Sequence, residues 1–523
     1  MQTRRRIRGV AAVMERTGWD AVVVGAGVGG LVAAGLLARA GRKVLLLEAH
    51  ETPGGCAGFY TAGGFTFDAG ATTLLGFDPG DPLAALAEAL GIRPGTDLVL
   101  EQMDGVDVRL PGVSFLHGRD TSGEECPAAR LFPGSSPFFR RLRRDAALLW
   151  ETSRSWPVLP LLSPRDAVRD LRLLSPRLLP LLPSFRKTVA DVFSSERAPA
   201  DPALGAFLDL ALLISVQSPA RDAPWWTGAL GIDLFRRGVS RARGGMRAFV
   251  EALAAAVTRA GGEIRTRTLV TRIGPSSRGW VVRTAAGEEI VARSVLPNLP
   301  VKDVARLLEP AGPLHAAAAR ESSRLGDGWG AFVLNLGLSR VLNDDPRRLH
   351  RLVASRLDGR PGDRTSLFLS FSPPGDPVAP PGGQTLTVST HVEAGEWEGL
   401  AREAYLRKKE GTRVLLREAL EREVPGLASA VAYEDAGTPR TFRRYTRRSG
   451  GSVGGLRTTR DNFALRALDP TLGAAGLHVV GDTAFPGQGT LAVAMSAAIA
   501  AERLGAVRLG RDGRVRLVQG GTR

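Results

Sequence analysis

Residues 20–48 read DAVVVGAGVGGLVAAGLLARAGRKVLLLE, and this stretch decides the fold. Residues 20–25 form a short apolar run rich in valine, which predicts a buried β-strand. The apolar pattern of residues 31–40 is typical of a helix, and Gly41 supplies its C-terminal cap. Residues 43–47 predict a second buried strand. Strand, helix and strand together indicate a βαβ unit with a parallel sheet.

The turn between the first strand and the helix has the spacing GxGxxG in Gly25, Gly27 and Gly30, and Glu48 follows 48 − 30 = 18 residues later. This spacing, after a strand and at the start of a helix, is typical of a dinucleotide site. Gly25 permits the tight turn, Gly27 lets the backbone approach a pyrophosphate, and Gly30 lets the helix pack closely on the strand. The helix N-terminus then faces the phosphates, and Glu48 is predicted to bind the ribose hydroxyls.

GxGxxG fits NAD and FAD alike, but two further loops favour a longer, flavin-type ligand. The loop PGGCAG at residues 53–58 exposes backbone at Gly54 and Gly55. Far along the chain, Asp482 offers a carboxylate to polyol hydroxyls, and the glycine turn of residues 486–489 aims a helix N-terminus at the far end of the ligand. Such a terminus stabilises the negative charge of a reduced flavin.

The composition is that of a soluble globular protein: 523 residues, 44% of them hydrophobic, with a net charge of 69 − 53 = +16. The positive charge is almost all arginine, and no zinc finger, RNA-recognition signature or basic heptad accompanies it, so we predict no nucleic-acid partner.

Cys56 and Cys126 are too few for a disulfide framework, which favours a reducing compartment. The histidines show no metal-ligand spacing, so no metal is predicted. Residues before Met14 are interpreted as a leader that is not a secretory signal.

Several longer segments resemble one known family, the flavin-dependent carotenoid desaturases and isomerases, which include bacterial phytoene desaturases, poly-cis carotenoid isomerases and retinol saturases. The resemblance extends from residue 20 to about residue 505, with GGMRAFVEALAAAVTRAGGEIRTRTLVTRI at 244–273 and GLHVVGDTAFPGQGTLAVAMSAAIAAERL at 476–504. The pieces GFTFDAGATTLLGF at 64–77 and GTPRTFRRY at 437–445 are closer to the isomerase-like branch.

The resemblance implies that FAD is the cofactor and assigns a role to individual positions. The backbone of Val270 is expected against the adenine, Asp482 at the ribityl chain, and residues 487–490 along the border of the flavin ring. Cys56 departs from the pattern, because many relatives in the wider flavin superfamily have arginine or serine there. The full set of predicted FAD-binding residues is Gly25, Gly27, Gly30, Glu48, Gly54, Gly55, Val270, Gly481, Asp482, Gly487, Gln488, Gly489 and Thr490.

The activity that the resemblance implies is desaturation of a carotenoid in carotenoid biosynthesis by hydride transfer to FAD, with C-3',4' desaturation as its specific form. A C–H bond next to a polyene is too weak an acid for a side-chain base, and the sequence has no Ser-His-Asp constellation or paired carboxylates. We therefore name no catalytic side chain from the sequence. Three alternatives stay open: a redox-neutral cis-to-trans carotenoid isomerase that uses reduced FAD, an amine oxidase, and a carotenoid carrier that keeps FAD structurally. The electron acceptor, quinone, oxygen or another, also stays open.

Residues 136–193 are rich in leucine, proline and arginine. Between Arg140 and Lys187, eleven basic and four acidic residues give an excess of 11 − 4 = +7. No stretch has the roughly 20 apolar residues that span a bilayer. One interpretation is a helical lid on the protein's own core; the other, which we favour, is monotopic docking on a membrane. The leucines expected to dock are Leu161, Leu162, Leu181 and Leu182, and the expected location is cytoplasmic, attached peripherally to the inner face of the membrane.

The predicted fold class is α/β, with a Rossmann-like FAD-binding domain whose parallel sheet is discontinuous in sequence, a second α+β domain for the substrate, and a helical membrane-facing region. The FAD-binding domain is assigned to residues 18–110, 236–300 and 465–507. The substrate and membrane-facing domain is assigned to 111–235 and 301–464, and flexible termini to 1–17 and 508–523. Further strands are expected at 264–273, 331–338, 385–391 and 476–480, and further helices at 248–260, 400–423 and 490–504.

Overall fold

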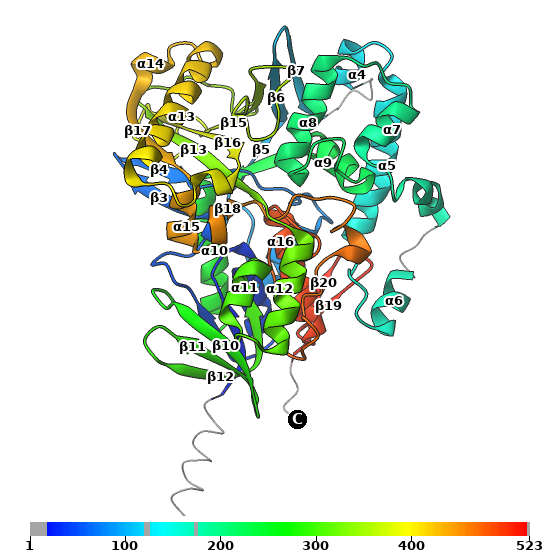
Figure 1. Ribbon diagram of the computed structural model, residues 1–523, viewed down its shortest axis with the longest axis vertical. Helices are drawn as coiled ribbons and strands as arrows, with labels where there is room; N and C mark the ends of the chain where they lie inside the picture. The colour runs from blue at the N-terminus through cyan, green and yellow to red at the C-terminus, as the bar shows by residue number, and fades with distance from the viewer. Residues whose placement is uncertain (1–17, 120–125, 172–175, 520–523) are drawn as a thin grey trace, which may run out of the picture.

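The computed structural model describes residues 18–119, 126–171 and 176–519. Two large sheets lie at opposite ends of the molecule, with helices packed between and beside them (Figure 1). The leader predicted before Met14 lies outside the described residues. Three small two-stranded sheets complete the strand set: β3 (Phe59–Ala62) with β4 (Phe65–Asp68), β5 (Leu100–Met103) with β8 (Val239–Ala242), and β19 (Val507–Leu509) with β20 (Val515–Leu517).

The first large sheet contains the predicted βαβ unit. β1 (Trp19–Val24) and β2 (Val44–Leu47) pair in parallel, and α2 (Val28–Arg39) connects them. β12 is parallel to β1 and β9 is parallel to β2, whereas β10, β11 and β12 form an antiparallel meander. The predicted parallel sheet is therefore confirmed for β12, β1, β2 and β9, and β10 and β11 extend it in antiparallel fashion. The strand order is β10 (Val270–Ser276), β11 (Gly279–Thr284), β12 (Glu289–Pro297), β1, β2 and β9 (Glu263–Arg265).

Helices cover both faces of this sheet, which explains why β1 is apolar without interruption. Ala21 and Val23 pack on the side of α2, α10 (Gly245–Arg259) and α16 (Thr490–Arg503). Val22 and Val24 pack on the opposite side with α11 (Val301–Leu307) and α12 (Pro313–Leu325). Because α2 lies between the sheet and two other helices, it is buried along almost its whole length.

The second large sheet is mostly antiparallel and is assembled from distant parts of the chain. β6 and β7 join it from the first quarter of the sequence, through a parallel pairing of β6 with β14. β6 lies within residues 18–110, which the sequence assigned to the FAD-binding domain; the domain boundaries themselves stay a prediction. The order is β17 (Val431–Gly437), β13 (Trp329–Leu338), β16 (Gln384–Val392), β15 (Ser366–Phe371), β14 (His350–Ala354), β6 (Gly105–Leu110) and β7 (Val113–Gly118), with β18 (Ser452–Val453) on β13.

A group of helices packs against the second sheet and shares its hydrophobic core. Figure 1 shows α5, α8 and α9 together on one side of this sheet, with α6 set apart below them. The remaining helices are α3 (Pro82–Leu90), α4 (Pro127–Leu131), α5 (Ser136–Arg154), α6 (Pro164–Leu171), α7 (Val189–Ser195), α8 (Pro202–Val216), α9 (Trp225–Arg237), α13 (Arg402–Glu423), α14 (Leu427–Ala430) and α15 (Pro439–Thr446), and Pro176–Ser184 is a 3-10 helix, η2.

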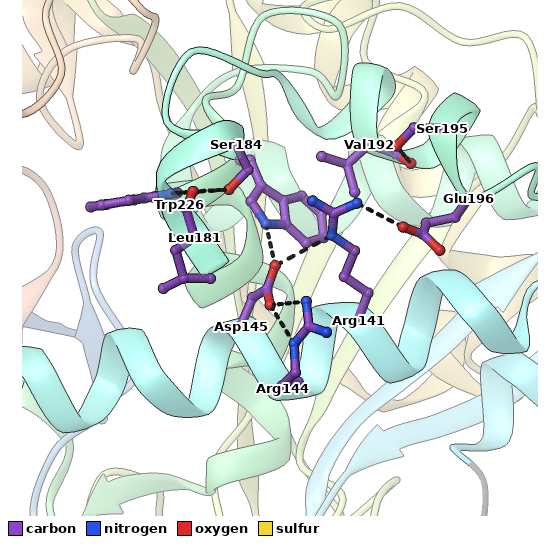
Figure 2. A network of polar contacts seen from close by, with 10 residues as sticks. Arg141, Arg144, Asp145, Leu181, Ser184, Val192, Ser195, Glu196 and Trp226 are labelled. Carbon is purple, nitrogen blue, oxygen red and sulfur yellow. Dashed lines mark hydrogen bonds and ion pairs between the residues drawn. The ribbon is translucent and has the colours of Figure 1, made fainter. Parts of the chain in front are cut away.

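A buried carboxylate fixes α5 in this group. Asp145 accepts hydrogen bonds from Arg144 at 2.8 and 2.9 Å and from Nε1 of Trp225 on α9 at 2.9 Å. Arg141 lies 3.4 Å from Oδ2 of Asp145, the oxygen that also accepts from Trp225, and donates to Glu196 at 2.7 Å, beyond the end of α7 (Figure 2). A buried charge is tolerated only with such partners. The helices of this region are therefore held firmly to the protein's own core.

Three sequence predictions differ from the structure. The single strand expected at 264–273 is two strands. β9 pairs with β2 and ends at Arg265, and the chain then turns before β10 begins the antiparallel meander at Val270. Residues 476–480 run beside β12 and form backbone hydrogen bonds with it, but only an isolated bridge at Leu477 qualifies as β-structure. Residues 508–519 are not a flexible terminus, since β19 and β20 form a hairpin whose Gly513 carbonyl accepts a hydrogen bond from buried Trp156 at 3.0 Å.

Candidate functional site

A cavity of about 1140 Å³ lies between the two large sheets. Small-molecule sites usually measure roughly 300 to 1,000 Å³, so this cavity has room for a large ligand and a second molecule. The structure brings the predicted cofactor residues together there from both ends of the chain. All of them line the cavity except two, Gly30 and Gly487, which adjoin it.

The GxGxxG turn has the geometry that its spacing predicts. Gly25 has a left-handed backbone with φ 98°. A Cβ on Gly30 would lie 2.0 Å from the carbonyl oxygen of Gly25, so only glycine lets α2 begin this close to β1. A Cβ on Gly27 would lie 2.8 Å from Nδ2 of Asn298. The glycines thus leave a cradle at the N-terminus of α2 that any side chain would fill.

Glu48 stands at the end of β2, where its carboxylate is held by backbone. Oε2 accepts a hydrogen bond from the amide of Ala26 at 2.7 Å, and Oε1 accepts one from the amide of His50 at 2.8 Å. Each carboxylate oxygen keeps a further lone pair for a ligand hydroxyl. Val270, at the first position of β10, lines the same end of the cavity. This arrangement suits the adenosine end of a dinucleotide.

The second glycine loop lies directly against the first. The amide of Gly54 donates to the carbonyl of Ala26 at 2.8 Å, and Gly54 forms an isolated parallel bridge with Gly27. Gly54 and Gly55 both have positive φ, and Gly55 opens a short 3-10 turn. Because both loops lack side chains where they meet, their backbone borders the cavity directly there.

Asn298 joins the two ends of the chain, a role that the sequence did not predict. Its Nδ2 donates to the carbonyl of Gly25 at 3.3 Å. A Cβ on Gly29 or on Gly481 would lie 2.8 Å from its Oδ1, so both glycines pack against this one amide. The sequence shows a polar residue, Asn298, directly after the residues of β12. Only the parallel pairing of β12 with β1 places this residue under the glycine turn.

Arg448 is a second residue that sequence reasoning missed. Its guanidinium pairs with the carboxylate of Asp482 at 2.8 Å, inside the cavity. Burial alone would lower the pKa of Arg448, but the negative charge of Asp482 raises it above the ordinary value for arginine. Nε of Arg448 is buried and has no hydrogen-bond partner within the described part of the chain. A permanent positive charge therefore stands where the ribityl and diphosphate part of the cofactor is predicted.

Cys56 also faces this arginine. Burial raises the pKa of the Cys56 thiol, although the positive charge of Arg448 opposes the shift. The thiol therefore stays protonated at neutral pH, which argues against a nucleophilic role.

We predict that replacing Arg448 by methionine weakens FAD binding at least about tenfold, because Asp482 would keep an unpaired negative charge beside an anionic cofactor. Arg448→Lys should give an intermediate loss, since lysine keeps the charge without the planar fork. Fluorescence titration of the apoprotein with FAD measures the dissociation constant. Arg443→Met is the matched control, because Arg443 belongs to the same segment but is more than half exposed, with Glu398 as its partner at 3.4 Å. Equal constants for Arg448→Met and the unaltered protein would contradict the assignment.

The opposite end of the cofactor region lies at the start of α16. Gly489 caps this helix and Thr490 is its first residue, so the helix N-terminus points at the cavity. Gly487 has φ 121° and forms the turn before it. Nε2 of Gln488 donates to the carbonyl of Ile214 in α8 at 3.4 Å, which ties the turn to the helices of the second sheet.

Beyond the predicted flavin end, the cavity wall is largely apolar at α8 and α9, whereas the strands of the second sheet add polar side chains, among them Asn335, Ser389, Thr390 and His391. It is formed by α8, α9 and the strands of the second sheet, and parts of segments 437–445 and 450–455 belong to it. Among the described residues, no group of three His, Cys, Asp or Glu side chains is arranged to hold a metal ion. The apolar residues of this part of the wall include Ile214, Leu230, Leu234, Val333 and Phe368.

Glycine-lined cradles lie at the N-termini of two helices, and a carboxylate follows β2. These features define a dinucleotide-binding protein whose cavity continues beyond the predicted cofactor site. Residues 28–505 match the model of the family described as flavin containing amine oxidoreductase. The chain belongs to this family. It is a flavin-dependent oxidoreductase, and its cofactor is FAD.

Individual relatives cover almost the whole chain. A chloroplastic prolycopene isomerase of Daucus carota is 28% identical, over 93% of this chain and 80% of its own length. A carotenoid 3,4-desaturase of Haloarcula japonica is 26% identical, over 93% of this chain and 98% of its own. The solved structure of wild-type putrescine oxidase with bound putrescine superposes with a TM-score of 0.64 at 14% identity, over 93% of this chain and 98% of that chain, which establishes a shared fold.

Proposed function

We propose that this flavoenzyme desaturates a carotenoid, with C-3',4' desaturation as the specific form. The observation that carries the proposal is the single cavity that continues from the FAD-binding residues into a largely apolar chamber. A polyene fits such walls, because burying its apolar surface is favourable. A charged amine would lose its hydration against the apolar part of these walls, which disfavours the amine oxidase alternative.

FAD, when bound, supplies the hydride acceptor, while the protein positions the polyene and keeps water away. Two hydrogens would leave the substrate, one as a hydride and one as a proton, and FAD would take up both as FADH2, so the overall step balances without a further co-reactant. Gly25, Gly27, Glu48 and Gly54 would hold the adenosine and diphosphate, and Asp482 with Arg448 the ribityl region. The apolar chamber would align the reacting C–H bond, so that orientation and dryness, not an acid or a base, are the contribution of this chain.

Redox-neutral cis-to-trans isomerisation is the second candidate, and the similarity to a prolycopene isomerase supports it. Purified FAD-loaded enzyme should be incubated with carotenoids in liposomes, with the products analysed by mass spectrometry and NMR. Desaturation predicts a product lighter by two hydrogens, whereas isomerisation leaves the mass unchanged. Release of peroxide from amines without conversion of any carotenoid would overturn both. Conversion with bleaching of the flavin under anaerobic conditions would exclude a mere carrier.

Membrane docking is the part of the proposal that explains how a hydrocarbon reaches the chamber. The cavity lining extends to Trp150, Ser153 and Pro157, at the end of α5 and the start of a segment with many exposed leucines. Among the described residues between Leu161 and Leu182, the exposed large apolar side chains are Leu161, Leu162, Val168, Leu171, Leu179 and Leu182. We call these six residues the docking patch. Among the described residues, no helix combines the length and apolarity needed to cross a bilayer.

Leu181 corrects the expected set of docking leucines. It belongs to η2 and is fully buried in the core, and its carbonyl accepts a hydrogen bond from Nε1 of Trp226 (Figure 2). Its neighbours Leu179 and Leu182 point away from that core and are 62% and 50% exposed. One face of this segment therefore packs on the core like a lid, and its other face is exposed and can contact a partner. The stretch from Arg140 to Lys187 has an excess of +7, of which Arg141, Arg154 and Arg169 pair with acidic residues outside it. The remaining positive charge supports an anionic bilayer as that partner, on the inner face of the membrane.

A further inference from the structure

Asp303 is a buried carboxylate in the first turn of α11, at the edge of the cofactor region. It lines the cavity and is only 7% exposed. Its contacts reach beyond its own helix. The amide of Ser449 lies 3.1 and 3.2 Å from its two oxygens, and the hydroxyl of Ser449 donates to one of them. The carboxylate therefore ties α11 to a segment 146 residues further along the chain.

That segment contains Arg448, the arginine of the cofactor region, directly before Ser449. Arg447 on one side and Gly450 on the other have left-handed backbones, φ 61° and φ 66°. The chain thus turns sharply on both sides of Arg448. A non-glycine residue such as Arg447 stays in this region of φ only when surrounding contacts hold it there. The hydrogen bonds from Ser449 to Asp303 are contacts of this kind.

Arg306, in the next turn of α11, completes a clamp around Ser449. Its Nη1 donates to the hydroxyl of Ser449 at 2.7 Å and lies 3.5 Å from the carboxylate of Asp303. The hydroxyl therefore acts as donor and acceptor at once. The side chain of Arg306 is 61% exposed and that of Asp303 only 10%. Because water screens the exposed arginine, the buried carboxylate contributes more to the clamp.

We propose that Asp303 is a positioning residue for the cofactor, which holds the guanidinium of Arg448 toward the ribityl and diphosphate part of FAD. Nε of Arg448 is buried and has no hydrogen-bond partner within the described ranges, so the guanidinium keeps a donor for a ligand. Without the clamp, the guanidinium would turn to Asp482 as a bidentate pair and leave the cofactor. The inference does not depend on which substrate the enzyme oxidises.

The test is a double-mutant cycle on FAD affinity, measured by fluorescence titration of the apoprotein. Asp303→Asn keeps the shape of the side chain, but it loses the charge and turns an NH2 group toward the donors of Ser449. We expect the dissociation constant to rise roughly three- to tenfold. Because Asp303 acts through Arg448, the double variant with Asp303→Asn and Arg448→Met should bind FAD no more weakly than Arg448→Met alone.

Asp303→Glu keeps the carboxylate and should recover most of the lost affinity. Asp327→Asn is the matched control, because Asp327 pairs with Lys302 of the same helix at 2.8 Å but is exposed; FAD affinity should stay unchanged. The melting temperature of each apoprotein reports damage to the fold. Should Asp303→Asn not fold, Ser449→Ala takes its place in the cycle. It removes only the hydroxyl from the clamp, so the expected rise is about two- to fivefold.

Additive losses in the double variant would overturn the inference, because Asp303 would then support the cofactor region without acting through Arg448. Tighter FAD binding by Asp303→Asn would also overturn it and would mean that this carboxylate repels the diphosphate directly. An unchanged dissociation constant in either single variant would overturn it as well. None of these results bears on the proposed carotenoid reaction, which is tested on the unaltered, FAD-loaded enzyme.

Discussion

Replacing Gly27 by valine is expected to give a protein that purifies without the yellow colour of FAD. The position lies between Asn298 and the loop of Gly54, and a Cβ there would already lie 2.8 Å from Nδ2 of Asn298. The branched side chain would then occupy the cradle at the N-terminus of α2, where backbone N–H groups meet the diphosphate. Hydrogen bonds to a charged group contribute about 1.5 to 3 kcal/mol each, so losing two predicts a loss in affinity on the order of a hundredfold or more.

The absorbance at flavin wavelengths relative to that at 280 nm measures the FAD content after reconstitution. Gly274→Val is the matched control, because Gly274 lies in β10 of the same sheet, with open space where its Cβ would stand and without a positive φ. Gly27→Ala should weaken binding less, since only the Asn298 side chain must shift. A Gly27→Val protein with full FAD content would remove the basis for the cofactor site.

Replacing four leucines of the docking patch by serine is expected to release the enzyme from anionic liposomes while its FAD content stays normal. At roughly 25 cal/mol per Å² of buried apolar surface, a leucine that inserts half of its side chain gains ~1 kcal/mol. Four substitutions therefore predict a loss in partitioning on the order of a hundredfold or more. Cosedimentation measures the effect. The four positions are Leu162, Leu171, Leu179 and Leu182.

The control for docking changes the same number of exposed leucines elsewhere, at Leu131, Leu406, Leu415 and Leu465. Two of these, Leu406 and Leu415, lie on α13, on the opposite side of the molecule from α6 (Figure 1). We expect this variant to bind liposomes like the unaltered protein. Equal binding by the docking variant would show that the segment serves only as a lid.

The first sheet and its helices could be predicted closely, because local patterns decide them. The valine run of β1, the glycine spacing and the apolar stretch of α2 each encode a backbone conformation within a few residues. The same local logic located α10, α13, β13 and β16 to within a few residues of their observed ends. It failed at residues 508–519, where the hairpin is stable because it packs on Trp156, a contact that no local pattern encodes.

The sequence by itself determined the βαβ unit, the glycines that admit a dinucleotide and the acidic residues at Glu48 and Asp482, since these depend on residue type and spacing. Only the tertiary structure decided which partners meet across hundreds of residues. Arg448 reaches Asp482, Asn298 joins Gly29 to Gly481, and Asp303 meets Ser449, because pairing of distant strands and burial in one cavity bring them together. Contacts of this kind depend on three-dimensional packing, which has no period in the sequence.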